Sequence, residues 1–184
     1  MFQSLTSKVI SGIVSLSMLL LSSYEGNIAE FSNIEAQFLS NKILLKTQLL
    51  NAFENDFEEI FKSGQTIEIF FEITIKDNSE VIHTNEFKHT VIFDPMEQFY
   101  TLNLEEQDSE TNVYSHENLK TKISEIEYLF ESDIKIPDEL QVTFTSYLKK
   151  MRLETLGEEY DMMMLWKFKK PKIKQTISKP EYEI

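Results

Sequence analysis

The sequence predicts a mainly β (α+β) fold, an antiparallel β-sandwich of about seven strands with two helices. Several runs alternate apolar and polar residues, and the connections between these runs are short enough to join antiparallel neighbours. Two other stretches place their apolar residues at helical spacing. The chain has 184 residues, a length typical of one domain, and its 4 Gly and 4 Pro argue against a low-complexity or disordered chain.

The first part of the predicted domain is a strand pair followed by a helix. Residues 34–38 and 43–47 alternate in polarity, and residues 40–42 supply turn material between them. The period then changes over residues 49–61. Gly64 stands where the C-terminal cap of a helix is expected. The apolar face of this predicted helix consists of Leu49, Phe53, Phe57, Ile60 and Phe61.

Three further runs predict an antiparallel meander. Residues 65–76 place five apolar side chains on one face of a strand, and residues 81–93 return after a turn. Asp94 and Pro95 predict the next turn, with the Asp94 side chain accepting backbone N–H bonds, and residues 98–106 form the third strand.

The last part of the chain predicts a helix and two strands. Residues 108–112 are expected to form a loop. Leu119, Ile123, Ile126 and Phe130 lie at helical spacing after Ser115, a suitable N-cap. Alternation then predicts strands from residue 140 and over residues 162–168. The predicted order of elements is ββ-α-βββ-α-ββ.

The N-terminus has the layout of a secretory leader. Lys8 precedes an apolar run from Val9 to Leu21, and small polar residues follow. The run is short for a membrane span, which needs about 20 residues. We therefore expect residues 1–26 to be a signal peptide or an N-terminal membrane anchor, and residues 27–184 to be a single β-sandwich domain with a lysine-rich C-terminal end. A packed N-terminal helix in a cytosolic structural subunit is the alternative.

Composition narrows the functional classes. The formal net charge is −13, which disfavours binding to nucleic acid. The absence of Cys excludes disulfides, thiolate metal sites and cysteine nucleophiles. With so few glycines, the sequence has neither a phosphate-binding loop nor the GxSxG motif of a serine hydrolase. No cofactor is expected.

The histidines do not form a recognisable site. His83 and His89 lie on one face of a predicted strand, but six residues of strand separate them by about 20 Å, too far for one metal ion. We interpret both as half-exposed strand residues. His89, Asp94 and Tyr100 occur together in a segment that could suggest catalysis. Asp94 is better explained as a turn former and Tyr100 as a packing residue, so no catalytic or metal-binding residue is predicted. The acidic runs at residues 54–59 and 105–110 are interpreted as solvated faces.

Two features remain as candidate binding surfaces. The lysine-rich end could contact an acidic partner or anionic lipid, or it could be an edge strand whose lysines discourage aggregation. Its possible partner-binding residues are Lys167, Lys169, Lys170, Lys172 and Lys174, and the binding hypothesis expects them to form one exposed patch. The second feature is Met162, Met163 and Met164 with Trp166. This run could be an adaptable binding surface, although core packing is the preferred interpretation.

A family resemblance supports the predicted compartment. A helix ending in "IFKSG" is followed by the alternating strand "QTIEIFFEITI". Val91-Ile92-Phe93-Asp94 through Gln98-Phe99-Tyr100 comes next, and later the strand "ELQVTFTSYL". This order resembles the DUF4390 family of uncharacterised exported bacterial proteins, over about residues 34–174. The resemblance implies an exported β-rich fold and carries no catalytic residue.

The sequence therefore favours an exported, non-enzymatic β-sandwich protein, periplasmic or anchored in the membrane and facing the periplasm. It would bind an envelope protein or an anionic membrane surface, and no nucleic acid. The alternative is a small hydrolase or ligand-binding enzyme. That alternative requires a pocket in which His89 or His116 meets a carboxylate at hydrogen-bonding distance.

Overall fold

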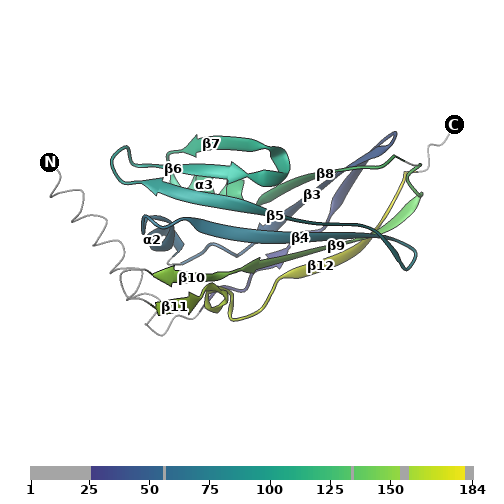
Figure 1. The fold of residues 1–184 in the computed structure, drawn as a ribbon. Helices are drawn as coiled ribbons and strands as arrows, with labels where there is room; N and C mark the ends of the chain where they lie inside the picture. Colours follow the sequence, from purple (N-terminus) through teal and green to yellow (C-terminus); the bar gives the residue numbers. More distant parts are fainter. Residues whose placement is uncertain (1–25, 56, 134, 154–157, 181–184) are drawn as a thin grey trace.

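A computed structural model describes residues 26–55, 57–133, 135–153 and 158–180. Within these ranges most residues lie in antiparallel strands (Figure 1). The strands are β1 (Glu30–Phe31), β2 (Glu35–Leu39), β3 (Lys42–Leu50), β4 (Ile67–Asp77), β5 (Glu80–Asp94), β6 (Phe99–Leu104), β7 (Ser109–Val113), β8 (Glu125–Glu131), β9 (Glu139–Leu148), β10 (Lys150–Leu153), β11 (Glu158–Asp161) and β12 (Lys172–Ser178). The α-helices are α2 (Phe57–Phe61) and α3 (His116–Ser124), and η1 (Glu105–Gln107) and η2 (Met162–Trp166) are 3₁₀-helices.

Two sheets face each other, and the predicted fold class is confirmed. The larger sheet has six strands in the order β12-β9-β4-β5-β6-β7. In the smaller sheet, β1, β2 and β8 all pair with β3, and a separate hairpin joins β10 to β11. All strand pairs are antiparallel. The predicted meander is β4, β5 and β6, and the predicted first strand pair is β2 and β3.

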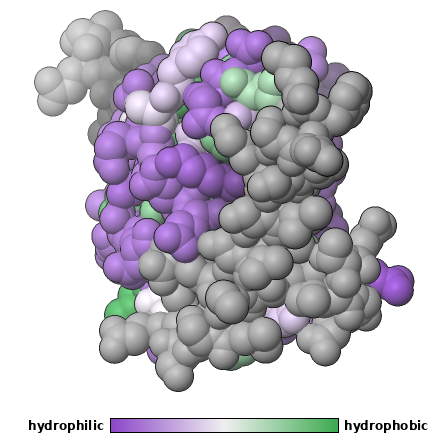
Figure 2. All heavy atoms as spheres, turned by 90° about the vertical axis from the view of Figure 1, so that its left-hand side faces the viewer, coloured by the Kyte–Doolittle hydropathy of each residue, from purple (hydrophilic) through white to green (hydrophobic). Residues whose placement is uncertain are grey.

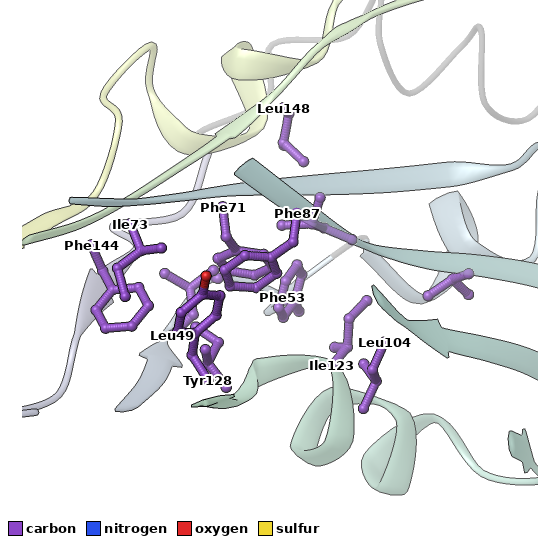
Figure 3. Close-up of a cluster of buried hydrophobic side chains, with 14 of the residues drawn as sticks. Leu49, Phe53, Phe71, Ile73, Phe87, Leu104, Ile123, Tyr128, Phe144 and Leu148 are labelled. Atoms are coloured by element: carbon purple, nitrogen blue, oxygen red, sulfur yellow. The ribbon is translucent and has the colours of Figure 1, made fainter. Parts of the chain in front are cut away.

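The core lies between the two sheets. The strands alternate in burial, so that β3 turns Ile43, Leu45 and Leu49 inward. Figure 3 shows aromatic rings from both sheets meeting there, with Phe71 and Phe87 opposite Tyr128. Burial of each large side chain contributes about 1.5–3 kcal/mol, so this aromatic core is the main source of stability.

The β5–β6 turn forms as the sequence predicts. The Asp94 carboxylate accepts hydrogen bonds from the backbone N–H groups of Met96 and Glu97, at 2.7 and 3.0 Å. Tyr100 is buried, with 2% of its surface exposed, and its ring packs against Phe93. The segment with His89, Asp94 and Tyr100 is therefore a structural hairpin.

The predicted helix over residues 49–61 is wrong in its first half. Its apolar residues are all buried, but Leu49 belongs to β3 and only Phe57–Phe61 are helical. Asn51 and Asn55 adopt positive φ values of 55° and 58°, which interrupt a right-handed helix. Gly64 has a φ of 79° beyond the end of α2, as expected near a helix C-terminus.

Three predictions in the second half also need correction. The second predicted helix ends at Ser124, and β8 follows it directly, burying Ile126, Tyr128 and Phe130 at the period of a strand. The loop predicted over residues 108–112 is largely the edge strand β7, Ser109–Val113, whose polar side chains give no apolar alternation. The predicted strand over residues 162–168 is the 3₁₀-helix η2, which Asp161 caps by accepting the Met163 N–H.

Gln175 of the edge strand β12 connects the two sheets. Its side-chain oxygen accepts the Ile34 N–H and its side-chain nitrogen donates to the Ile34 carbonyl, each at 2.8 Å. The amide therefore makes the two bonds that a neighbouring backbone residue would make in a β-ladder. This pair of bonds holds β12 against the segment between β1 and β2.

The predicted leader, apart from Gly26, lies outside the described residues. The described chain begins at Gly26, whose φ is 65° and whose Cβ, if it had one, would lie 2.9 Å from the Met164 carbonyl oxygen. Asn27 connects this end of the described chain to η2 and to the segment after β3. Its backbone N–H donates to the Leu165 carbonyl at 2.7 Å, and its side chain donates to the Ala52 carbonyl at 3.2 Å. Within the described part of the chain, no helix has the length and hydrophobicity needed to cross a membrane.

Candidate functional site

The five predicted lysines are all exposed, and the fold divides them between two places. Lys170 lies beside the larger sheet, and Lys172 and Lys174 project from the outer face of β12. Lys167 and Lys169 lie near Asn27, where the described chain begins. This division differs from the single patch that the binding hypothesis expects, because the bend of the chain after η2 separates Lys167 and Lys169 from the other three lysines.

A groove runs across the outer face of the larger sheet at the Lys172 and Lys174 side chains. Strand register explains it: Lys172 pairs with Thr145 and Lys174 with Thr143, and the next strand, β4, contributes Lys76. The groove has a volume of about 210 Å³. We call it the lysine groove, and its lining is Glu72, Thr74, Lys76, Gln141, Thr143, Thr145, Lys172 and Lys174.

The lysines of the groove are electrostatically unpaired. Within the described ranges, no carboxylate lies within 4.0 Å of the ammonium groups of Lys76, Lys172 or Lys174. Other lysines of the chain do form ion pairs. These are Lys42, Lys46, Lys62, Lys88, Lys120, Lys149 and Lys150. Against the Glu72 carboxylate of the same lining, the groove has three cations, so it carries a positive balance on a chain of net charge −13.

Beside the groove, two aromatic rings lie on the outer face of the same strands. The Phe70 and Tyr147 rings stack with centroids 5.3 Å apart. The Lys149 ammonium lies 3.6 Å from the Phe70 centroid, and the Lys170 ammonium lies 4.4 Å from the Tyr147 centroid. Burial raises the pKa of the Tyr147 hydroxyl to about 12, and a hydrogen bond to the Glu86 carboxylate adds to the rise. The hydroxyl is therefore a proton donor and not a nucleophile at neutral pH.

The second place is where the described chain begins. A hollow of about 240 Å³ is lined by Asn27, Ile28, Ala29, Trp166, Lys167 and Lys169. Phe168 lies between the two lysines in sequence and is 68% exposed, as is Ile28. We call Ile28, Lys167, Phe168 and Lys169 the N-terminal corner. In the end-on view of Figure 2, the coloured surface is mostly hydrophilic.

The methionine run packs in the core, as the preferred interpretation states. Met162, Met163 and Trp166 are buried and Met164 is half-buried. The Trp166 ring nitrogen donates to the Ala52 carbonyl at 2.9 Å.

His89 does meet a carboxylate, but inside the protein. Its Nδ1 donates to the Ile123 carbonyl at 2.8 Å, and its Nε2 lies 3.0 Å from a carboxylate oxygen of Glu106. Both side chains have 0% of their surface exposed. The interpretations of His89 as half-exposed and of Glu106 as part of a solvated face are therefore wrong. Leu104, the last residue of β6, pairs with His89 of β5, and η1 begins at the next residue. The turn of η1 therefore brings Glu106 back over the His89 ring.

This buried pair differs from the contact that the enzyme hypothesis requires. Both nitrogens of His89 are engaged, one by a backbone carbonyl and one by Glu106. With no exposed surface on either side chain, a substrate cannot reach the pair without opening the fold. The arrangement joins β5, η1 and the end of α3, and its evident role is structural.

The other histidines lie apart from this pair. His83 is half-buried, as predicted, and its Nε2 is 2.7 Å from the Tyr128 hydroxyl. Burial lowers the pKa of His83. The pKa of His116 is lowered as well, because the effect of burial exceeds the opposing effect of the Glu58 carboxylate. His116 Nδ1 and the Tyr100 hydroxyl are buried and have no hydrogen-bond partner within the described part of the chain.

No metal centre is apparent in this part of the molecule. Among residues 26–55, 57–133, 135–153 and 158–180, no group of three or more His, Asp or Glu side chains is arranged to hold an ion. Lys76, Tyr147 and Lys149 also lie in or beside this candidate site, and the sequence pattern does not single them out because their positions depend on strand register.

Comparison of the chain with models of protein families, with curated proteins and with solved structures gives no match. The resemblance to the DUF4390 family therefore stays a prediction.

Proposed function

We propose that this chain is a non-enzymatic binding protein of the bacterial cell envelope, and that it holds an acidic segment of a partner protein in the lysine groove. The observation that carries the proposal is the set of three unpaired ammonium groups around one groove on an acidic chain. Export rests on the leader-like sequence before Gly26.

The polar lining suits an extended acidic peptide. Thr74, Thr143 and Thr145 can donate hydrogen bonds to carboxylates or to a peptide backbone, beside the ammonium groups. The cations come from β4 and from the edge strand β12, so they stand on both sides of the central strand β9. A carboxylate between them would be within reach of more than one cation.

Charge complementarity sets both specificity and rate. An acidic surface repels most anionic molecules, whereas a local positive groove steers an acidic segment to one place. The attraction acts over about 8 Å at physiological ionic strength, so the more distant carboxylates of the chain are largely screened.

The test is a titration of a fluorescent oligoglutamate peptide, followed by anisotropy. For the full chain we expect saturable binding that weakens as salt is raised. The variant Lys172→Glu/Lys174→Glu should weaken binding at least about tenfold, because two attractive charges become repulsive.

The matched control is Lys122→Glu/Lys135→Glu, which makes the same charge change at two exposed lysines outside the groove. This control should bind the peptide nearly as well as the unaltered chain. Equal loss in both variants would show that the peptide responds to net charge alone and would contradict the proposal.

A further inference from the structure

The N-terminal corner combines two cations with two exposed apolar side chains, beside the point where the N-terminal segment joins the domain. Lys167 and Lys169 line one hollow with Ile28, and Phe168 lies between them in sequence. No carboxylate lies within 4.0 Å of either ammonium group in the described part of the chain.

The backbone at this corner is strained. Lys167 and Phe168 adopt consecutive positive φ values of 52° and 57°, a conformation that costs a residue with a large side chain appreciable free energy. Their N–H groups bind the carbonyls of Met164 and Met163, at 3.0 and 2.8 Å, in the pattern of a Schellman motif. Glycine usually occupies the position that Lys167 holds.

Phe168, the next residue, also departs from the usual form of this motif. An apolar residue at its position usually packs back onto the preceding helix, whereas the Phe168 side chain is 68% exposed. Strain of this kind persists where the surrounding structure enforces it, and it is enriched at functional sites. The chain therefore holds a large aromatic side chain out in solvent between two lysines.

Acidic side chains of neighbouring elements are engaged elsewhere. The Glu30 carboxylate, two residues from Ile28, accepts from the Asn51 side chain at 3.3 Å. Glu54, whose carbonyl accepts from Asn27, pairs through its carboxylate with Lys120 at 2.8 Å. Asp161 caps η2 by accepting the Met163 N–H. The corner is locally positive although the whole chain is acidic.

The sequence before the corner indicates what covers it. Gly26 packs against Lys167 and Met164, so the N-terminal segment leaves the domain at this corner. The apolar run that ends at Leu21 is only five residues away, a reach of at most about 17 Å. Any bilayer that receives this run must lie within that reach of Gly26.

We infer that the N-terminal corner docks on the head groups of an anionic phospholipid bilayer. Lys167 and Lys169 contact the anionic head groups, and Phe168 and Ile28 enter the interfacial region. The inference rests on the proposed envelope location, with the apolar run retained as a membrane anchor, but it uses none of the residues of the lysine groove. Docking here would fix the orientation of the domain and leave the lysine groove facing a partner.

The test uses the full chain with a single environment-sensitive label. Because the protein has no Cys, Ile28→Cys can be labelled alone, with Phe168 and both lysines intact. Val81→Cys, the second residue of β5 and 51% exposed, is the matched labelled control. The β4–β5 turn beside it lies at the other end of the larger sheet from η2 (Figure 1). Each protein is mixed with vesicles of phosphatidylcholine alone or with added phosphatidylglycerol.

We expect a blue shift of the label at position 28 on vesicles with phosphatidylglycerol, and little shift at position 81. Each lysine near an anionic surface contributes a factor of about five, so Lys167→Ala/Lys169→Ala should lower the docked-to-undocked ratio about 25-fold. Phe168→Asn should lower it roughly tenfold, since Asn accepts positive φ but has no apolar ring. Lys172→Ala/Lys174→Ala should leave the ratio nearly unchanged.

Three results would overturn the inference. An equal shift at positions 28 and 81, or an equal shift with and without phosphatidylglycerol, would mean that the corner does not dock on anionic lipid. An unchanged shift in Lys167→Ala/Lys169→Ala would mean that the N-terminal segment alone brings the label to the membrane. In each case binding of the oligoglutamate peptide is measured separately, so failure of the corner is distinguished from failure of the lysine groove.

Discussion

The buried contact between His89 and Glu106 predicts a large energetic coupling between the two residues. Nδ1 of His89 donates to the Ile123 carbonyl and Nε2 is hydrogen-bonded to the Glu106 carboxyl group, so both ring nitrogens have a partner. Removing one member therefore leaves the other buried without its partner.

The expected free energies follow from this geometry. His89→Leu leaves the Ile123 carbonyl without the ring and the Glu106 carboxyl with the Gln107 side chain as its remaining donor. It should lower the free energy of unfolding by about 3 kcal/mol, the lower end of the range for a broken buried pair. Glu106→Leu leaves one ring nitrogen unsatisfied and should cost about 1–3 kcal/mol. The double variant removes both polar groups and leaves only the Ile123 carbonyl unpaired, so it should cost about 1–3 kcal/mol as well.

Urea unfolding of the four proteins at neutral pH, followed by circular dichroism, measures these values. We expect the double variant to be more stable than the sum of the single changes predicts, by about 2 kcal/mol or more. Additivity within about 0.5 kcal/mol, or single changes that each cost less than that, would refute the structural role of the pair.

Three further predictions concern stability. Burial lowers the pKa of His83 and of His116, so the unfolded chain binds more protons than the folded chain near and below pH 6.5. The stability of the fold should therefore decrease as the pH drops through this range. The variant His83→Gln/His116→Gln should show a smaller decrease in melting temperature over the same range. Gln175→Leu removes both hydrogen bonds to the smaller sheet and should lower the free energy of unfolding by about 2 kcal/mol in urea, unless water satisfies the freed groups. Gly26→Ala should destabilise the domain more than Gly64→Ala, since both have positive φ but only the first meets a close contact; equal losses by calorimetry would contradict the crowding at position 26.

The sequence predicts the sheets better than the helices, for a physical reason. The strands β4 and β9 alternate cleanly because one face of each is buried and the other is solvated. Over residues 49–61 the same apolar spacing that fits a helix is produced by a strand end, a turn and one short helix. Asn51 and Asn55 were the available signals, because asparagine tolerates positive φ better than most residues.

The helix-to-strand change at Ser124 has a weaker signal. Glu125-Ile126-Glu127-Tyr128 alternates, but the step from Ile123 to Ile126 also fits a helix, and neither Gly nor Pro separates the two periods. Tertiary pairing with β3 decides the outcome, and single-sequence patterns do not contain that information.

The candidate sites show the same limit. Exposure of the five lysines could be predicted from their charge, whereas their division between a groove and a corner depends on η2 and on two residues with positive φ. Glu106 looks like any other residue of an acidic run, and its burial depends on how η1 turns back over His89.

A nuclear magnetic resonance titration tests whether an acidic segment binds in the lysine groove. The account predicts that an oligoglutamate peptide shifts the backbone amide signals of Thr74, Thr143 and Lys174. Signals of the smaller sheet, such as that of Leu44, should stay in place. Shifts spread over all exposed lysines, or no shifts on β4, β9 and β12, would contradict the proposed binding function.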